Sequence, residues 1–363
     1  MKILILTNND VGLYRFRKEL LSAMLAQGHR IAISLPEGDF IPALKDMGCE
    51  YIPTHFESRG MDPTADLRLL LHYRRILKEV QPDLVITYTV KPNVYGGLAC
   101  RMAKIPYVCN VTGLGSAMQK KGALHRLVTG LYHCGLKRAS SVIFENSSNA
   151  ETMQHMNVVT KQQTHVLPGA GVNLEEYDPA PYPADDGTTR FLYIGRVMRD
   201  KGMNEFFACA EKLKAAYGDA VSFDLVGWIH ENYGERTHSL EEKGVLTFHG
   251  YRDDPWTFYD ACSCLVMPTY HEGMNNVVQE AAATTRPVIT TDIPGCREAV
   301  LDGISGLLCS PRDEKDLYRV MEEFHRLPYE EKKAMGVESR HLMEQRFDRR
   351  FVVDETMKIL FSE

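Results

Sequence analysis

Short apolar runs alternate with amphipathic segments along most of the chain. The first run, residues 2–7, is followed by an amphipathic segment that ends at Gly28. Apolar runs of this length are typical of buried strands, and a 3.6-residue period indicates helices. The alternation predicts further strands at residues 30–35, 50–54, 83–88, 106–111, 141–145 and 164–167, and helices at 15–27, 66–80, 93–103, 123–138 and 147–156.

The alternation breaks once and then starts again. Residues 168–188 hold four prolines and few large apolar residues, which is typical of a connection between domains. Strands joined by helices form parallel sheets that are covered on both faces. The sequence thus predicts an α/β chain with two Rossmann-like parallel-sheet domains, residues 1–170 and 171–345. In the second, strands are expected at residues 190–194, 221–226, 245–249, 264–267 and 287–291, and helices at 204–217, 254–261, from 276 onward, at 313–326 and at 330–345.

Two glutamates mark the start of one predicted helix, in the spacing E-x7-E. They are Glu272 and Glu280, and Gly273 between them lets the backbone pass close to a ligand. Asn276 is expected to cap the helix, with Gln279 reaching back as a partial capping box. A helix N-terminus favours phosphate, and carboxylates accept hydrogen bonds from sugar hydroxyls. The stretch fits a phosphorylated sugar; the alternative is a surface loop with two solvated glutamates.

Two cations follow the strand that opens the second domain. Arg196 and Lys201 come after Gly195, at the mouth of the next helix. Ligands bind at the carboxyl ends of strands in parallel α/β sheets, and Arg with Lys matches the charge of a diphosphate. The alternative is a pair of solvated surface cations.

These motifs resemble those of the family-4 retaining glycosyltransferases of the GT-B fold. The resemblance is carried by Y-H-E-G-x5-Q-E-A-A-A from Tyr270, by P-V-I-T-T-D-I-P-G-C-R-E-A-V from Pro287 and by D-G-x-x-G-L-L from Asp302. It implies two domains that face a central cleft, with residues 346–363 returning as a helix to the first domain. It also implies a UDP-sugar donor.

The resemblance implies a role for each of the site residues. Catalytic roles fall to Arg196 and Lys201, which neutralise the departing diphosphate, and to Glu272, which contacts the donor hexose. Glu280 accepts from the ribose hydroxyls, and no protein nucleophile is required. The implied donor-binding residues are Gly12, Gly195, Gly227, His249, Gly250, Gly273, Met274, Asn275, Asn276 and Glu280.

The first domain resembles the acceptor side of one subgroup, which extends undecaprenyl-diphosphate-linked saccharides. The motifs are T-V-K-P-N and N-V-T-G-L-G, and the implied acceptor-side residues are Lys91, Asn110, Thr112 and Gly113. Many relatives carry a histidine near Asn110, so no catalytic base is assigned. Two further departures are Asn275, where proline is common and hexose selection is expected to change, and Thr285, where glycine usually ends the helix.

The composition and net charge of the chain exclude some classes of binding partner. The chain has 363 residues, of which 44% are hydrophobic and 25% charged, with a net charge of −6. This balance argues against nucleic acid as a partner. Nine cysteines without paired C-x-x-C spacing predict buried thiols in a reducing cytoplasm. Neither a signal peptide nor a spanning segment is expected. No metal site is evident, so the enzyme is expected to need no metal or cofactor beyond its UDP-sugar co-substrate.

One region departs from this acidic average. Between Asp83 and Glu145 there is no Asp or Glu, whereas there are eight cations, Lys91, Arg101, Lys104, Lys120, Lys121, Arg126, Lys137 and Arg138. The predicted helix 123–138 places Leu124, Leu127, Val128 and Leu131 on one side. A basic amphipathic helix can lie on an anionic membrane surface. The alternative is that its leucines pack into the first domain.

The predicted function is transfer of a hexose or N-acetylhexosamine from a UDP-sugar, with retention, to a glycan hydroxyl. The glycan is expected to be lipid-linked and to belong to a cell-surface polysaccharide, and the enzyme to be cytoplasmic and peripheral on the inner face of the membrane. One alternative is a nucleotide-sugar 2-epimerase of the same fold, which needs no acceptor. A second is a non-catalytic glycan-binding module.

Overall fold

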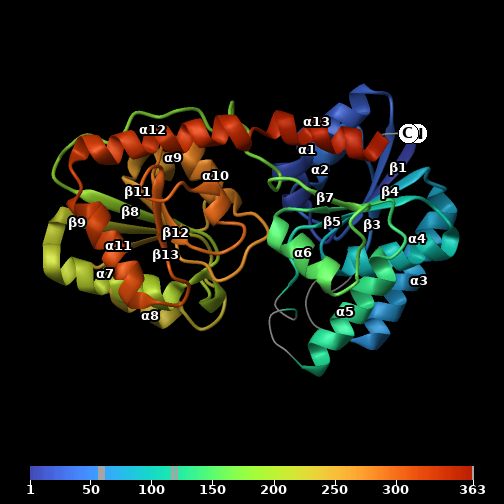
Figure 1. Cartoon of the computed structure of the whole chain (residues 1–363), viewed down its shortest axis with the longest axis horizontal. Helices are drawn as coiled ribbons and strands as arrows, with labels where there is room; N and C mark the ends of the chain where they lie inside the picture. The colour runs from blue at the N-terminus through green and yellow to red at the C-terminus, as the bar shows by residue number, and fades with distance from the viewer. Residues whose placement is uncertain (56–61, 116–117, 119–121, 362–363) are drawn as a thin grey trace. The chain divides into compact units, whose positions relative to one another are not determined.

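The computed structural model describes residues 1–55, 62–115, 118 and 122–361. The chain divides into two compact units, one formed by Met1–Ala170 with Arg350–Glu363 and the other by Gly171–Arg349. Each unit has its own parallel sheet and its own hydrophobic core (Figure 1). The chain therefore contributes to the first unit twice, at its start and at its end.

Seven parallel strands build the first unit, in the order β3-β2-β1-β4-β5-β6-β7. Successive side chains alternate between two faces, so that Leu4 and Leu6 enter one core while Ile3 and Ile5 enter the other. Both faces are buried, which is why these strands read as continuous apolar runs. The strands are β1 Lys2–Leu6, β2 Arg30–Leu35, β3 Glu50–Pro53, β4 Leu84–Tyr88, β5 Tyr107–Val111, β6 Ser141–Phe144 and β7 Thr164–Val166.

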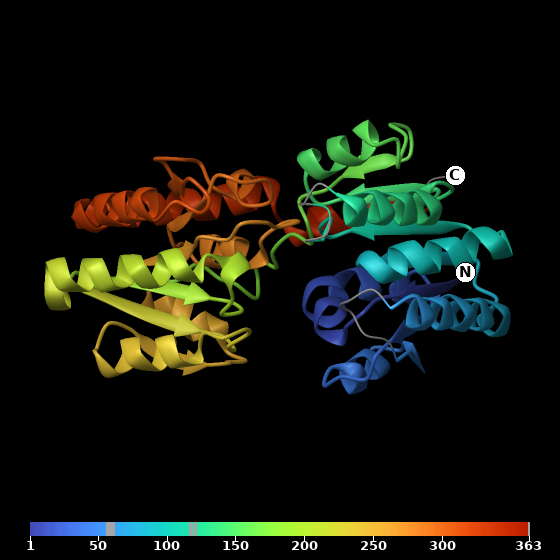
Figure 2. The ribbon, with the colours of Figure 1, turned by 90° about the horizontal axis from the view of Figure 1, so that it is seen from below.

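Helices cover both faces of this sheet. On the Leu4 side lie α3 Pro63–Val80, the π-helical turn η1 Pro92–Gly96, α4 Gly97–Ala103, α5 Ala123–Leu136 and α6 Ser147–His155. On the Ile3 side lie α1 Asp10–Ala26, α2 Ile41–Asp46 and α13 Arg349–Phe361. Figure 2 shows α3, α4 and α5 side by side in one layer.

The last helix, α13, is part of the first unit. Val352 and Leu360 are buried in the core on the Ile3 side, and Met357 packs against it. This core also contains Leu13 and Leu20 of α1. The C-terminal helix thus completes a core that begins with the first strand of the chain.

The second unit is a six-stranded parallel sheet in the order β10-β9-β8-β11-β12-β13. It surrounds a single large cluster of buried residues that includes Phe191, Phe206 and Phe223. Its strands are β8 Thr189–Ile194, β9 Val221–Val226, β10 Thr247–Gly250, β11 Cys264–Met267, β12 Val288–Thr291 and β13 Gly306–Cys309. Its helices are α7 Met203–Tyr217, α8 Gly234–Glu242, α9 Pro255–Ala261, α10 Asn276–Ala283, α11 Glu314–Arg326 and α12 Tyr329–Arg346, with short 3-10 turns η3 Arg199–Lys201, η4 Gly218–Ala220 and η5 Arg297–Ala299.

The predicted fold class, two Rossmann-like parallel-sheet domains, is confirmed. Three elements were not predicted, namely α2, α8 and β13. They are short, and α8 buries only Thr237 and Leu240, so it carries no clear apolar stripe. The helix predicted at 93–103 begins instead as the π-helical turn η1.

The cysteines agree with the prediction of buried thiols. Eight of the nine are buried, and Cys134 is exposed. Burial raises the pKa of the Cys49 thiol to about 11 and that of Cys109 to about 12. These thiols act as small apolar side chains of the core.

Candidate functional site

The strand order of the second sheet reverses at β8. This strand pairs with β9 on one side and with β11 on the other, which makes it a topological switch point. Ligands of open α/β sheets bind outside the carboxyl ends of the strands at such a point. The loop after β8 carries Lys201 and the loop after β11 carries Glu272. The structure joins them, because Lys201 Nζ lies 2.5 Å from Glu272 Oε1. Both side chains are largely buried, at 17% and 14% exposure.

Tight backbone packing holds these two loops together. Gly202 has φ of 73°, and a Cβ at this position would lie 2.0 Å from the carbonyl oxygen of Pro268. Only glycine therefore fits here. The amide of Tyr270 donates to the carbonyl oxygen of Asp200 at 2.9 Å. The Lys201–Glu272 pair is thus fixed from both loops.

Arg196, the other predicted cation, follows the same strand end. Its side chain is half-buried, and its guanidinium makes no ion pair with the residues that the structure describes. Its carbonyl oxygen accepts a hydrogen bond from the Tyr193 hydroxyl at 2.8 Å. Because the backbone is held while the cation has no protein counter-ion, the guanidinium is available to an anion.

The cap of α10 is Asn275, not Asn276 as predicted. Asn275 Oδ1 accepts from the amide of Val278 at 3.2 Å, and its Nδ2 donates to Glu272 Oε1 at 3.0 Å. The expected capping box is absent: Gln279 is fully buried, and within the described residues its amide group has no hydrogen-bond partner. The extended backbone of Asn275 places that side chain, rather than the next one, over the first turn.

Gly295 packs closely against the backbone of the loop that carries Glu272. Its φ is 87°, and an added Cβ would lie 2.4 Å from the carbonyl oxygen of Gly273. Its own carbonyl oxygen accepts from the amide of Asn275 at 2.8 Å. Gly295 belongs to the motif that starts at Pro287, but no role for it was predicted from the sequence. Only its contacts show that it shapes the site loop.

Glu280 lies further along α10 and is 9% exposed. Its Oε2 accepts a hydrogen bond from the Tyr259 hydroxyl at 2.8 Å. Burial and the nearby charge of this carboxylate raise the pKa of the Tyr177 phenol. Neither tyrosine was predicted as a site residue, because both are distant from Glu280 in sequence.

The remaining predicted donor residues lie around the same strand ends. Met274 is buried, Asn276 is the first residue of α10, and Gly273 lies in the Glu272 loop. Gly227, after β9, has φ of 140°, and a Cβ there would lie 1.9 Å from the carbonyl oxygen of Gly195. These two predicted glycines therefore let the ends of β8 and β9 approach closely.

Aromatic rings border the ends of β9 and β10. His249 Nε2 lies 2.6 Å from Asp224 Oδ1, so this predicted residue is held by a neighbouring strand, and Gly250 follows it at the end of β10. Trp228 and Tyr251 are about half exposed, with ring centroids 4.6 Å apart. The sequence analysis missed this pair, which offers an apolar face to a planar group.

In the first unit, the amide of Gly12 is already occupied. It donates to Asn9 Oδ1 at 2.6 Å, because Asn9 caps α1. Gly12 thus makes a helix-capping contact, and its donor-binding role stays a prediction. Neighbouring Asp10 is buried and accepts from the amide of Phe40 at 2.7 Å.

The predicted acceptor-side residues gather at the ends of β4 and β5. Lys91 Nζ lies 3.0 Å from Asp66 Oδ1, and the Tyr95 hydroxyl donates to Asp66 Oδ2 at 2.8 Å. Buried Asn93 donates to the carbonyl oxygen of Asn110 at 2.8 Å. Thr112 and Gly113 follow β5 in a loop, with Gly113 at φ of 142°.

Backbone strain marks the same sheet edge. Thr89, just after β4, has φ of 69°, which is an outlier for a β-branched residue. The chain then enters the π-helical turn η1. Strained residues and π-turns cluster at functional sites, so these features favour a binding role for this edge.

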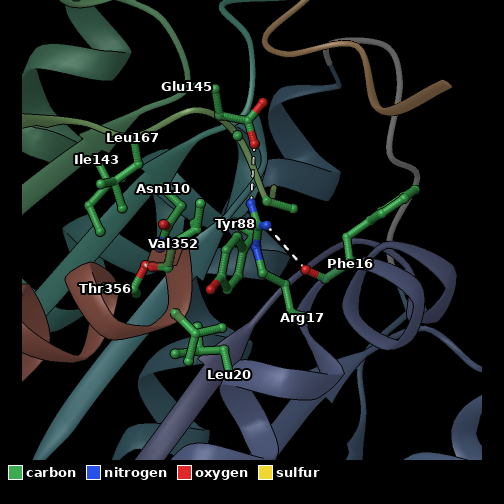
Figure 3. Close-up of a pocket in the computed structure, with 13 residues that line it drawn as sticks. Phe16, Arg17, Leu20, Tyr88, Asn110, Ile143, Glu145, Leu167, Val352 and Thr356 are labelled. Atoms are coloured by element: carbon green, nitrogen blue, oxygen red, sulfur yellow. Dashed lines mark hydrogen bonds and ion pairs between the residues drawn. The ribbon is translucent and has the colours of Figure 1, made fainter. Parts of the chain in front are cut away.

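Asn110 also lines a small cavity within the first unit (Figure 3). Arg17 spans it, with Nη2 3.1 Å from Glu145 Oε1 and the guanidinium over the Tyr88 ring. Val352 of α13 closes another side. Its volume of about 20 Å³ suits a water molecule and not a sugar.

Among the residues that the structure describes, no group of three or more His, Cys, Asp and Glu side chains is arranged to hold a metal ion. No helix found there has both the length and the apolar character to cross a membrane.

Comparison with known proteins identifies both units. Residues 2–146 match the family model described as Glycosyl transferase 4-like, and residues 188–326 match Glycosyl transferases group 1. The chain is 28% identical, over 87% of each chain, to the N,N'-diacetylbacillosaminyl-diphospho-undecaprenol alpha-1,3-N-acetylgalactosaminyltransferase of Campylobacter jejuni. It is 25% identical to the UDP-Gal:alpha-D-GlcNAc-diphosphoundecaprenol alpha-1,3-galactosyltransferase of Escherichia coli, over 72% of this chain and 71% of the relative.

Solved structures give the same fold. The structure of HepE from Anabaena, in complex with UDP and glucose, superposes with a TM-score of 0.79 at 18% identity, over 99% of each chain. The relatives named above are transferases, and they give the epimerase alternative no support. The chain therefore belongs to the glycosyltransferases of the GT-B fold, with a 4-like first domain and a group 1 second domain.

Proposed function

We propose that this enzyme transfers a hexose or N-acetylhexosamine from a UDP-sugar to a hydroxyl of an undecaprenyl-diphosphate-linked glycan, with retention at the anomeric carbon. The observation that carries the donor proposal is the Lys201–Glu272 pair at the point where the second sheet changes direction. The lipid-linked acceptor draws support from two relatives whose names include a diphospho-undecaprenol or diphosphoundecaprenol acceptor. Such a reaction belongs to cell-surface polysaccharide assembly.

The chemistry follows from the charges at the site. The diphosphate gains negative charge as the sugar leaves, and Arg196, Lys201 and the amides at the start of α10 are suited to stabilise it. When the donor binds, Lys201 exchanges Glu272 for phosphate, which frees the Glu272 carboxylate to accept hydrogen bonds from the hexose. Because the β-phosphate can take the acceptor proton, the mechanism requires no protein nucleophile.

The same cations make a metal unnecessary for offsetting the diphosphate charge. Turnover is therefore expected to persist in EDTA, measured by UDP release. A loss of turnover in EDTA that Mg²⁺ or Mn²⁺ restores would contradict this proposal.

A panel of UDP-sugars tests the function directly. Each donor is incubated with and without polyprenyl-diphosphate saccharides, and both UDP release and the lipid-linked product are measured. One donor is expected to give an α-linked product on a lipid-linked acceptor. Transfer only to free saccharides would remove the lipid-linked acceptor, and a free epimerised nucleotide sugar would favour the isomerase.

Glu272→Gln separates hexose binding from nucleotide binding. This variant keeps the shape of the side chain but removes the charge that pairs with Lys201 and accepts from the hexose. It is expected to weaken the intact donor more than UDP, measured by calorimetric titration of both. Equal weakening of the two ligands would contradict the hexose contact.

We also propose that the first unit binds an anionic membrane surface, where a lipid-linked acceptor would be met. The predicted leucine face of α5 is divided: Val128 is buried and Leu131 packs against the core, whereas Leu124 and Leu127 are 49% and 52% exposed. In the same layer, α3 exposes Leu67 and Leu71, and α4 exposes Met102.

Exposed cations accompany these apolar side chains. On the described residues of this layer they are Arg68, Arg74, Arg75, Lys78, Lys104, Arg126, Lys137 and Arg138. Apolar side chains that insert between lipids and cations that meet anionic headgroups are the two parts of a peripheral membrane site. Of the cations named from the sequence, Lys120 and Lys121 lie outside the described residues.

Vesicle co-sedimentation tests this surface. Binding is expected to rise with the anionic lipid fraction, to fall with salt, and to drop in the double variant Leu124→Ser with Leu127→Ser. Val337→Ser is the matched control, because Val337 is 43% exposed on α12 of the other unit. If the protein binds neither anionic nor neutral vesicles, the proposed membrane surface is contradicted.

A further inference from the structure

The Glu280 carboxylate is almost buried, and two tyrosines lie near it. Tyr259 donates a hydrogen bond to Oε2 at 2.8 Å. Burial and the nearby Glu280 charge raise the pKa of the Tyr177 phenol. A buried carboxylate is costly unless donors satisfy it, and the Tyr259 hydroxyl fixes the orientation of one of its oxygens.

The two tyrosines form one packed unit. Tyr259, on α9, is fully buried, and Tyr177 is 8% exposed. Their ring centroids lie 6.2 Å apart in an edge-on arrangement. Burial raises the pKa of both phenols above their usual range, so each hydroxyl keeps its proton and remains a donor at neutral pH.

Two arginines hold the backbone around both rings, the fully buried Arg286 and the partly buried Arg340. Arg286 donates to the carbonyl oxygen of Tyr259 at 2.7 Å and to that of Pro181 at 2.8 Å. Arg340 donates to the carbonyl oxygen of Tyr177 at 2.7 Å. Residues 168–188, which were predicted to be a connection between domains, are thus held in place at Tyr177 and Pro181.

We propose that Tyr259 and Tyr177 are positioning residues for donor binding, which hold the Glu280 carboxylate in the orientation that receives the ribose hydroxyls. This inference rests on the proposed function, in which Glu280 binds the ribose. The tyrosines act through Glu280 and do not touch the donor. A carboxylate offers about four acceptor sites, so it can receive ribose hydroxyls as well as the Tyr259 hydroxyl.

Removal of a single hydroxyl tests the proposal. Tyr259→Phe keeps the ring and its packing but removes the hydrogen bond to Glu280. It is expected to weaken UDP binding roughly 5- to 20-fold, a moderate loss because the hydroxyl acts on UDP only through the position of the carboxylate. Tyr177→Phe is expected to act in the same direction. Affinity is measured by calorimetric titration of the full chain with UDP, and the melting temperature is recorded for each variant.

Tyr182→Phe is the matched control. Tyr182 is a tyrosine of the same segment, and its hydroxyl donates to the carbonyl oxygen of Ser263 at 2.9 Å, away from Glu280. It is expected to lower the melting temperature about as much as Tyr259→Phe while leaving UDP affinity within about twofold of the parent.

A double-mutant cycle separates positioning from general destabilisation. In the Glu280→Gln background, Tyr259→Phe is expected to cause no further loss of UDP affinity, because its effect passes through the carboxylate. Parent-like UDP binding by both Tyr→Phe variants, or a full additive loss in the cycle, would overturn the positioning role alone. Unchanged UDP affinity in Glu280→Gln would instead overturn the ribose contact, and the positioning role with it.

Discussion

At the residue scale, the central observation is that Lys201 is paired with Glu272 at the proposed donor site. An ion pair shielded from water costs desolvation energy that its Coulomb attraction only partly offsets. A diphosphate carries more charge than one carboxylate and is a stronger partner for Lys201. The ion pair therefore holds the Lys201 ammonium and the Glu272 carboxylate in position, and each group can give up this contact for one to the donor.

The cations are predicted to act on the rate. Arg196→Ala and Lys201→Ala are each expected to lower kcat by roughly 10²- to 10³-fold, the scale of losing one contact to developing charge. Lys212→Ala is the control, because Lys212 also forms an ion pair, with Glu314, but lies on the exposed surface. Steady-state kinetics with the intact donor checks this, and near-parent kcat in both variants would exclude the two cations from the site.

Local spacing explains which site residues the sequence could predict. Arg196, Lys201, Glu272 and Glu280 lie within two short motifs, and the structure keeps each at a strand end or on the following helix. Tyr177 and Tyr259, which lie near Glu280, come from segments distant from it in sequence, so no spacing links them to it. Whether Asn275 or Asn276 caps α10 depended on backbone angles that the pattern does not encode.

At the element scale, the helix α10 and the loop before it are linked into one structural unit. Asn275 links them, because its side chain caps the helix and also contacts Glu272. The strands around them were predictable because burial on both faces produces continuous apolar runs. The elements α2, α8 and β13 were not, because short or polar segments leave little periodic signal.

Asn275→Ala removes both contacts of that side chain. The loss of the cap is expected to cost about 1 kcal/mol of unfolding free energy, and Glu272 loses a donor. Asn275→Asp is the comparison, since aspartate also caps helices but cannot donate to Glu272. Urea denaturation should show a smaller loss for Asn275→Asp, and an equal loss in both variants would contradict the capping role.

At the scale of the whole molecule, the first unit depends on the end of the chain. Val352 and Leu360 of α13 are buried in the same core as Ile3 and Leu20. The composition of the chain marks a single boundary, at residues 168–188, and the return of residues 346–363 to the first domain was expected only from the family resemblance. The unit that forms its own core is discontinuous. Such discontinuity arises from packing and leaves no mark in local composition.

Truncation after Arg349 removes α13 and is expected to destabilise the first unit by roughly 5 kcal/mol or more, given the burial of several large apolar side chains. Phe351→Ser is the control, because Phe351 belongs to α13 but is 53% exposed. Calorimetry should show a lower transition for the truncated chain and little change for Phe351→Ser. A transition unaffected by truncation would contradict the structural role of α13.

The placement of α13 also matters while the protein is being made. The ribosome releases the chain from its N-terminus, and roughly 180 residues separate β7 from α13, which takes roughly 10–40 s at typical elongation rates. During that time the face that carries Ile3, Ile5 and Leu20 lacks its final cover. The nascent first unit is therefore a natural client for chaperones, and it finishes packing only after translation of the second unit.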